Sequence, residues 1–324
     1  MFRANEPNLR NIRQLTFGGE NAEAYFSADG RRIIFQSTRP PFDADQMFTM
    51  NADGSHVNLV STGKGRCTCG FFSPDGKKII YSSTDWKDPK PPPPADRSQG
   101  YVWPLHPYRL FMANADGSNR EALSDGDAYC AEASFSPDGK KILLTSNRDG
   151  DLDLWEIELR TKKWTKLTDQ QGYDGGAFYS WDGKKIVYRA YHPRNPTEIE
   201  EYKSLLAKNL VRPSQMELWI MDSDGRNRRQ ITQLGGANFA PFMRPGNRQI
   251  IFSSNHTNPR GREFDLFMIN VDGSGLSQVT TTPDFDGFPM FSKNGRKLLF
   301  SSNRNAKTPG ETNVFIADWV DVKR

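Results

Sequence analysis

One short segment recurs along this sequence and constrains the fold more than any other feature. The segment FSPDGKKI occupies residues 72–79 and again residues 135–142. Weaker copies begin at Phe26, Tyr179 and Phe291, and a sixth copy, at Phe242, keeps only a turn glycine. The turn glycines of the six copies are Gly30, Gly76, Gly139, Gly183, Gly246 and Gly295. A unit of four strands with tight turns needs about 40–45 residues. Each interval therefore holds one unit, and the two longest intervals also carry an insertion.

Each unit contains the pattern of four short antiparallel strands. The first strand leads to an Asp-Gly or Asn-Gly turn, which supplies the positive φ of a two-residue hairpin. Apolar residues alternate in the second strand, as in residues 78–83, and the third strand, as in 265–269, ends at a second turn. A short fourth strand, as in 277–280, closes the unit. Six such units predict an all-β six-bladed β-propeller of four-stranded antiparallel blades.

The last unit has little room for a fourth strand, because the chain ends soon after residues 313–316. At the other end, residues 11–16 read NIRQLT and resemble residues 228–232, RRQIT, which are expected to form a fourth strand. We therefore expect a single propeller domain over residues 1–324. In this domain an N-terminal strand at about residues 11–17 completes the last blade and leaves only short edges exposed.

Two insertions, at about residues 84–108 and 191–215, fall between the second and third strands of their units. These loops and the loops that join successive units lie on one face of a propeller, called here the elaborated face. The opposite, plain face carries the two-residue turns. In the second insertion, a capping-box pattern at Thr197–Glu200 follows Pro196 and precedes apolar residues at helical spacing. We expect one short helix from about Thr197 to Asn209.

The phrases FSPDGKKI, SNRDGDLDLW and NADGSN resemble the TolB-like propeller repeat, and the resemblance covers nearly the whole chain. Such propellers form the protein-binding domain of TolB, occur as stand-alone periplasmic proteins and are fused to peptidases. Residues 96–103 and 235–241 resemble a TolB-family subgroup. Some members of that subgroup resemble the front half of a metallo-aminopeptidase, and we do not expect the second half in this chain. The resemblance implies a periplasmic or secreted protein. Residues 1–10 contain no apolar segment of a signal peptide, so a cytoplasmic location is the alternative.

The loops of the elaborated face hold side chains that are suited to binding. Aromatic residues and arginine are enriched in binding hot spots, and histidine is a frequent metal ligand and general base. The candidate binding residues are Arg39, Trp86, Tyr101, Trp103, Tyr108, Arg148, Tyr191, His192, His256 and Arg304. Each has a structural alternative, since aromatic side chains can anchor the insertions and arginines can bond to neighbouring loops.

The innermost strand of each blade faces the central channel, so an alignment of the six first strands predicts its lining. Five residues before the repeat aromatic stand Asn21, Cys67, Cys130, Asp174, Ala237 and Asp286. Three residues before it stand Glu23, Cys69, Glu132, Gly176, Phe239 and Phe288. Residues two apart on a strand share a face, so both sets either line the channel or turn into the gap between blades. The cysteines suggest a zinc site by their Cys-x-Cys spacing, or small buried apolar residues.

If both sets line the channel, four carboxylates surround a narrow passage. These are Glu23, Glu132, Asp174 and Asp286. Like charges at that spacing favour a bound cation or a raised pKa, and oxygen ligands would suit calcium or magnesium. The alternative is that the carboxylates make structural hydrogen bonds. No other cofactor is implied.

Charge and motifs narrow the function. The formal net charge is +4, without a block of Lys or Arg that would bind nucleic acid, and no apolar run is long enough to insert into a membrane. No zinc-peptidase, nucleophile-elbow or phosphate-loop motif is present. We predict a monomeric binding or scaffold propeller that recognises a protein, peptide or glycan through the elaborated face. The alternative is a metal-assisted lyase or hydrolase at the channel mouth, which would use His106, His192 or His256.

Overall fold

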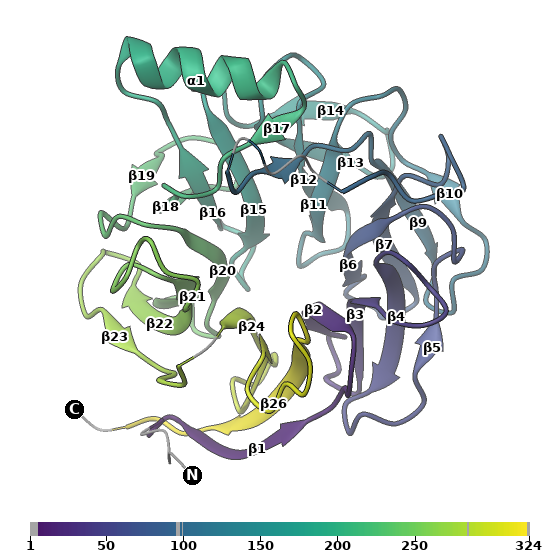
Figure 1. The fold of residues 1–324 in the computed structure, drawn as a ribbon, viewed down its shortest axis with the longest axis vertical. Coiled ribbons are helices and arrows are strands. Elements are labelled where there is room, and N and C mark those ends of the chain that lie inside the picture. Colours follow the sequence, from purple (N-terminus) through teal and green to yellow (C-terminus); the bar gives the residue numbers. More distant parts are fainter. Residues whose placement is uncertain (1–5, 95–97, 99, 284, 323–324) are drawn as a thin grey trace.

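The strands form six four-stranded antiparallel sheets around one axis, which confirms the predicted six-bladed propeller (Figure 1). This computed structural model describes residues 6–94, 98, 100–283 and 285–322. The first blade consists of β2 (Glu20–Phe26), β3 (Arg32–Thr38), β4 (Gln46–Asn51) and β5 (Asn58–Leu59). The second consists of β6 (Cys67–Phe72), β7 (Lys78–Ser83), β9 (Arg109–Asn114) and β10 (Glu121–Ala122). The third consists of β11 (Cys130–Phe135), β12 (Lys141–Ser146), β13 (Asp153–Glu158) and β14 (Trp164–Lys166). The fourth blade consists of β15 (Tyr173–Tyr179), β16 (Lys185–Tyr191), β18 (Glu217–Asp222) and β19 (Arg229–Gln230). The fifth consists of β20 (Asn238–Met243), β21 (Gln249–Ser254), β22 (Asp265–Asn270) and β23 (Ser277–Gln278). The sixth consists of β24 (Asp286–Phe291), β25 (Lys297–Ser302), β26 (Asn313–Trp319) and β1 (Leu9–Gln14).

The last blade contains both ends of the described chain. Its strands follow the order β1-β26-β25-β24, so the most N-terminal strand lies beside the most C-terminal one (Figure 1). Gln14 stands opposite Phe315, and Leu15 N donates a hydrogen bond to the carbonyl of Val314 at 2.8 Å. The outer strand of this blade therefore comes from the opposite end of the sequence.

The repeated segment exists because it builds a self-contained turn. In the second blade, Ser73 Oγ donates to Asp75 Oδ1 at 2.6 Å, and the same carboxylate accepts the Lys77 amide at 3.0 Å. Gly76 follows with a φ of 67°, a conformation that glycine adopts at little cost. Ser, Asp and Gly recur together because each supplies one part of this turn.

The blade built from the weakest copy is offset by one residue from the sequence alignment. Asn247 N donates to the Arg244 carbonyl, as Gly76 N donates to the Ser73 carbonyl in the second blade. Asn247, with a φ of 59°, is therefore the turn residue, and Gly246 takes the place of the turn aspartate. Met243, rather than Phe242, consequently occupies the position of the repeat aromatic.

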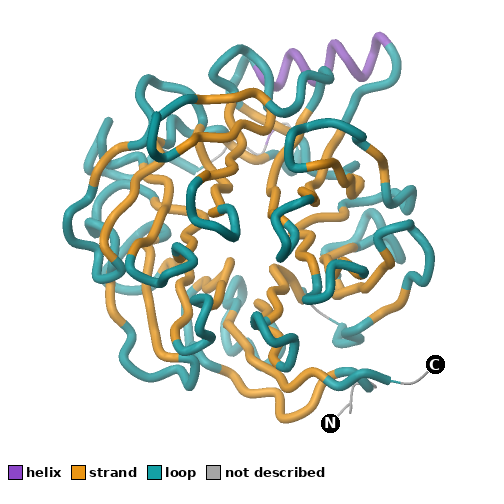
Figure 2. The backbone as a smooth tube through the Cα atoms, turned by 180° about the vertical axis from the view of Figure 1, so that it is seen from behind, coloured by secondary structure: helices purple, strands orange, loops and turns teal. Residues whose placement is uncertain are grey.

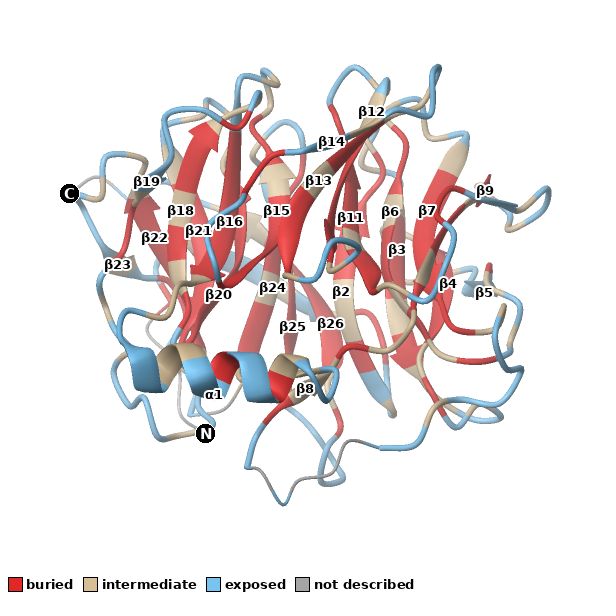
Figure 3. Ribbon diagram, turned by 90° about the horizontal axis from the view of Figure 1, so that it is seen from above, coloured by how far each residue is buried: buried red, intermediate tan, exposed pale blue. Residues whose placement is uncertain are grey.

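The core lies between the blades, because each sheet packs both faces against its neighbours. The second strands are apolar over several consecutive residues for this reason, as in Leu298, Leu299 and Phe300 of β25, which are fully buried. Figure 3 shows this burial along the middle of the blades, with exposed residues mainly in the loops. No helix among the described residues has the length and apolar character needed to cross a membrane.

The two insertions meet on the elaborated face. β8 (Trp103–Pro104), from the first insertion, pairs antiparallel with β17 (Leu210–Val211), from the second. Next to β17 in sequence is the one described helix, α1 (Pro196–Leu206), which confirms the predicted helix. Figure 3 places α1 and β8 on the same side of the ring, and Figure 2, seen from behind, shows the short turns of the plain face. Residues 95–97 and 99 of the first insertion, together with part of the 96–103 resemblance, lie outside the described residues.

The start of α1 differs from the predicted capping box. Asn195, rather than Thr197, is the N-cap: its Oδ1 accepts the Glu198 amide at 3.0 Å. Glu198 in turn accepts the Asn195 side-chain amide at 2.8 Å, which completes a reciprocal cap with Pro196 in the first turn. The error arose because asparagine caps a helix as well as threonine does.

Candidate functional site

The first strand of every blade has a β-bulge at the channel. The residues at the six bulges have positive φ values between 49° and 58° and are Glu23, Cys69, Glu132, Gly176, Ala240 and Phe288. All six line one central cavity of about 30 Å³. A bulge redirects a side chain, and here it turns one residue of each blade toward the axis. Ala240 stands where the sequence alignment placed Phe239, which is a consequence of the one-residue offset in that blade.

The second predicted set does not share this orientation, because the bulge interrupts the alternation of the strand. The residues at this position are Asn21, Cys67, Cys130, Asp174, Asn238 and Asp286, and all are buried. They face the second strand of their own blade: Ser37 Oγ donates to Asn21 at 2.8 Å, and Ser254 Oγ donates to Asn238 at 2.6 Å. Asn238 replaces the predicted Ala237 because of the same offset.

The four predicted carboxylates therefore belong to two environments. Glu23 and Glu132 line the cavity, whereas Asp174 and Asp286 lie within their blades. Asp174 lies 2.9 Å from His192 Nε2, and Asp286 lies 3.0 Å from an Arg304 nitrogen. Within the described ranges, no group of three or more His, Cys, Asp and Glu side chains is arranged to hold a metal ion.

Five of the predicted binding residues hold equivalent positions just after the second strands. Each packs against an aromatic ring of its own blade. The closest pairs are Arg39 with Phe48 at 5.2 Å, Arg148 with Trp164 at 4.1 Å, His192 with Trp219 at 5.1 Å, His256 with Phe267 at 4.5 Å and Arg304 with Phe300 at 4.8 Å. In the second blade Asp85 occupies this position and binds Arg120, which stacks on Phe111 at 3.3 Å. These side chains stabilise the rim of each blade.

The predicted aromatic residues of the insertions separate into anchors and one exposed ring. Tyr108 is buried, and Trp103 and Tyr191 pack against the same apolar cluster beneath the insertions. Trp86 Nε1 donates to the Pro107 carbonyl at 2.9 Å. Tyr101 is different, since 66% of its surface is exposed.

The remaining histidine of the elaborated face, His106, packs edge-on against Tyr108, with ring centroids 5.8 Å apart. Burial, assisted by the nearby positive charge of Arg66, lowers the pKa of His106 to about 4. The imidazole is therefore neutral at neutral pH.

Glu132 is the most heavily bonded group of the channel floor. Its carboxylate accepts hydrogen bonds from Thr145 Oγ1 at 2.7 Å, from Tyr173 Oη at 2.8 Å and from the Gly176 amide at 2.8 Å, and it forms an ion pair with Arg189. Gly175 and Gly176 leave the space for this cluster. A Cβ at Gly176 would lie 2.8 Å from the Arg189 guanidinium, and one at Gly175 would lie 2.3 Å from Tyr173 Oη.

Glu23 faces the same cavity, and within the described part of the chain no Lys, Arg or His side chain forms an ion pair with it. Its side chain is partly exposed inside the channel, and the Cys69 thiol hydrogen-bonds to it. Burial raises the pKa of Glu23 to about 7. The Cys69 hydrogen bond and the more distant Arg189 charge act against this rise, while repulsion from Glu132 adds to it. Near neutral pH this carboxyl group is therefore close to its titration midpoint.

An aromatic wall comes from the fifth and sixth blades, and its member Phe288 lines the same cavity as the two glutamates. Its members are Phe239, Phe264, Phe285 and Phe288, whose neighbouring ring centroids lie 5.2–6.4 Å apart. Phe264, Phe285 and Phe288 remain partly exposed. Sequence reasoning missed Phe264, Phe285 and Arg189. The sequence signal for the two phenylalanines was a Phe-Asp pair that occurs at residues 264–265 and again at 285–286. In the structure both pairs stand where a strand starts, and a β-bridge joins Phe264 to Phe285.

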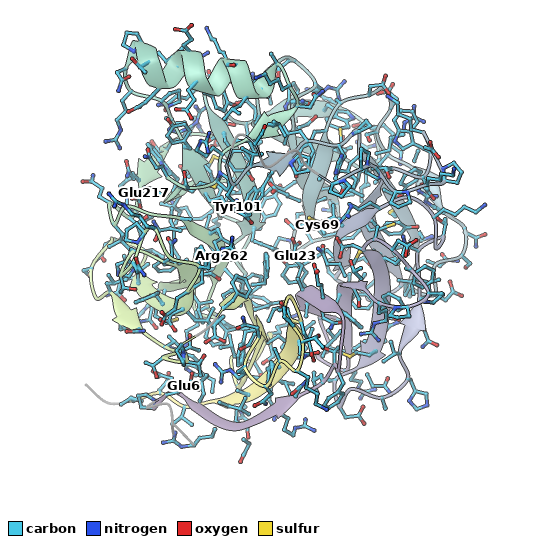
Figure 4. The ribbon with its side chains drawn as sticks, viewed as in Figure 1. Glu6, Glu23, Cys69, Tyr101, Glu217 and Arg262 are labelled. Carbon is cyan, nitrogen blue, oxygen red and sulfur yellow. The ribbon has the colours of Figure 1, made fainter. Side chains whose placement is uncertain are left out.

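A second aromatic layer closes the channel on the side of the plain face. Tyr25, Phe71, Phe178 and Phe242 pack with ring centroids 5.2–5.8 Å apart. Figure 4 looks into the elaborated face and shows Glu23 and Cys69 near the axis, with Tyr101 and Arg262 around it. The channel is thus a pocket that opens on the elaborated face. Its floor is acidic, and one wall is aromatic.

Comparisons by sequence find relatives that match part of the chain. The chain is 31% identical over 122 residues to dipeptidyl-peptidase 5 of Porphyromonas endodontalis, a match that spans 37% of this chain and 16% of that protein. It is 26% identical over 125 residues to the Tol-Pal system protein TolB of Anaeromyxobacter dehalogenans, which spans 39% of this chain and 24% of that protein. The matches thus span less than a quarter of each relative. No protein-family model matches the chain.

Comparisons by structure cover almost the whole chain. A TolB-type protein from Agrobacterium tumefaciens matches 96% of this chain and 97% of its own, with a TM-score of 0.63 and 16% identity. TolB from Acinetobacter baumannii matches 93% of this chain and 64% of its own, with a TM-score of 0.60 and 18% identity. An oligogalacturonate lyase in complex with manganese matches 96% and 93%, with a TM-score of 0.57 and 12% identity. At these identities the likeness concerns the fold.

Proposed function

We propose that this chain, whose fold is that of the TolB-like six-bladed propellers, is a binding module that holds a protein or peptide partner on its elaborated face. The observation that carries the proposal is the pairing of β8 with β17, which joins two separate insertions above one end of the channel. Long loops are costly to order and in compact domains are disproportionately functional. The TolB likeness supports the same role, since TolB is named as part of the Tol-Pal system.

The joined insertions rest on a core of their own. Tyr202 and Leu205 of α1 are buried, and the Tyr202 hydroxyl lies within hydrogen-bond distance of Asp151, at 2.5 Å, and of the Gly172 carbonyl, at 2.6 Å. Val211 and Leu105 belong to the same apolar cluster. The insertions are therefore a rigid support, which lowers the entropy lost when a partner binds.

The surface beside this support has the chemistry of a binding hot spot. Tyr101 and Arg262 are exposed around the channel mouth (Figure 4). Phe264 and Phe285 of the aromatic wall are partly exposed. Aromatic rings and arginine contribute most of the affinity in typical interfaces. The plain face consists mainly of two-residue turns. The aromatic layer beneath those turns is packed into the core of the ring.

The test is a displayed random-peptide library selected against the immobilised full chain. Enriched peptides are then titrated by fluorescence anisotropy against wild type, Tyr101→Ala, Arg262→Ala and the plain-face control His56→Ala. We expect the first two variants to weaken binding by roughly tenfold each, because hot-spot truncations cost at least that much. His56→Ala should bind as wild type does. Peptides that lose affinity for His56→Ala but keep it for Tyr101→Ala would contradict the proposal.

The sequence also predicted alternative functions, and each of these can be tested separately. A glycan partner, a bound calcium or magnesium ion, and the lyase or hydrolase alternative can be examined by glycan-array binding, metal analysis and an oligogalacturonate cleavage assay. The TolB likeness also supports a periplasmic location, which fractionation of the native organism would test.

A further inference from the structure

We propose that the channel floor binds a primary ammonium group at the end of an extended ligand, either the amino terminus of a peptide or a lysine side chain. The group would lie against the Glu23 carboxylate, with the attached chain along Phe288 and Phe285. This inference rests on the proposed function, because it names the chemistry that the mouth of the elaborated face would recognise.

The first support is charge balance in the cavity. Glu132 is neutralised by Arg189, so Glu23 leaves the floor with one unbalanced negative charge when it is ionised. A carboxylate taken out of water is unstable unless a cation joins it or a proton neutralises it. An ammonium group provides the cation and three hydrogen-bond donors.

The second support is size and shape. The cavity of about 30 Å³ holds a group of the size of a water molecule, which suits an ammonium better than a planar guanidinium. Divalent ions that prefer oxygen take six or more ligands, and Glu23 supplies the one carboxylate of the cavity that is not already paired.

The third support is the aromatic wall, which continues from the floor toward the mouth. The Phe288 ring lies 6.1 Å from that of Phe285, which lies 5.8 Å from that of Phe264. The first strands run from the elaborated face to the plain face, so Phe285 lies nearer the mouth than Phe288 does. Ring faces attract cations and cover aliphatic segments, and this wall would therefore guide the chain that carries the ammonium.

The aromatic layer at Tyr25 and Phe178 gives the site a closed end. Tyr25 and Phe178 both line the cavity, and their ring centroids lie 5.6 Å apart. A chain that enters from the elaborated face would end at this layer. The site therefore selects a terminal group over an internal one.

The probes are an array of seven-residue peptides in matched sets: free and acetylated amino termini, and lysine or norleucine at one position. Labelled full chain is applied as wild type, Glu23→Gln, Tyr101→Ala, Arg262→Ala and the control Glu200→Gln. The control removes the same charge from an exposed position of α1. We expect wild type to bind the ammonium-carrying member of each set about tenfold or more tightly than its partner. This ratio corresponds to the free energy of one charge-assisted hydrogen bond. Glu23→Gln should abolish the preference, and Glu200→Gln should keep it.

The pH dependence distinguishes the two sources of the ammonium. The groups that face Glu23 are Cys69, Glu132, Arg189, Tyr25 and Asp45. The preference should fall below about pH 7, where Glu23 becomes protonated. If the ammonium is a peptide amino terminus, the preference should also disappear above a pH of about 8, where that amine loses its proton. If it is a lysine side chain, the preference should persist to a pH of about 10.

Two results would overturn the inference. If acetylation and norleucine leave binding unchanged while Tyr101→Ala still weakens it, the ammonium site is wrong and the binding face stands. If no array peptide depends on Tyr101 or Arg262, both proposals fail. The melting temperature of Glu23→Gln shows that a lost preference does not come from unfolding.

Discussion

At the residue scale, the ionised carboxylate of Glu23 lowers the stability of the folded chain. Its pKa is about 7 in the folded protein against 4.5 for the free side chain, so the folded state holds the proton more tightly. The contribution of Glu23 to stability should be greatest below a pH of about 4.5 and should be lost as the pH rises through 7. Glu23→Gln should remove this dependence and raise the free energy of unfolding at pH 8 by about 3 kcal/mol.

Urea denaturation of wild type, Glu23→Gln and Glu200→Gln at pH 5 and pH 8 measures this effect. The control variant should follow wild type at both values. A Glu23→Gln protein that is less stable than wild type at pH 8 would show that the carboxylate is well satisfied in the fold. A gain in stability together with a loss of ammonium preference is typical of a functional residue.

The residue scale is also where sequence reasoning failed most clearly. Strand alternation predicted that residues two apart share a face, but the bulge at each first strand separates Asn21 from Glu23. A bulge leaves no strong sequence signal here, because five of the six bulge residues are not glycine. The offset at Asn247 had a signal, since asparagine tolerates positive φ nearly as well as glycine does.

At the scale of elements, α1 should depend on its buried face. Leu205 is 5% exposed and, with Tyr202, forms the buried face of the helix. Leu205→Ala should therefore lower the free energy of unfolding by about 2–3 kcal/mol. Chemical denaturation measures this loss, and the exposed helix position Glu200→Ala serves as a control with little effect. A Leu205→Ala protein as stable as wild type would mean that α1 contributes nothing to the folded core.

The N-cap offers a second test of the same element. Asn195→Ala removes the side chain that accepts the Glu198 amide, so helix stability should fall by about 1 kcal/mol. Thr197→Ala, at the position that the sequence pattern favoured, should have a smaller effect. Amide hydrogen exchange at Ile199 and Tyr202 reports the opening of the first turns. The opposite order of effects would restore the cap predicted at Thr197.

The positions of individual strands and of the helix were easier to predict than the contacts between elements that are distant in sequence. Local patterns located the hairpin turns and the helix, because each depends on residues close in sequence. The pairing of β8 with β17 joins residues 103–104 to 210–211 and has no local signal. Arg189 was missed for the same reason, since its partner Glu132 lies on another blade.

At the scale of the whole molecule, the ring depends on β1. Deletion of residues 1–17 would expose the edge of β26 and remove Glu6, which pairs with Arg304 at 3.0 Å. The free energy of unfolding should fall by about 4 kcal/mol or more, because an entire strand and its buried contacts are lost. Calorimetry and light scattering measure the loss and any aggregation. Glu6→Gln, which removes only the ion pair, should have a much smaller effect, and a truncated chain that melts like wild type would contradict the dependence.

The central claim is that the elaborated face, rather than the plain face, makes the biological contact. Hydrogen exchange of the full chain with and without a peptide selected from the library tests it directly. We expect slower exchange at residues 100–105, 262–264 and 285–288, with no change at the plain-face turns around Asp53, Asp116 and Asp224. Protection confined to those turns, with the channel mouth unchanged, would contradict it.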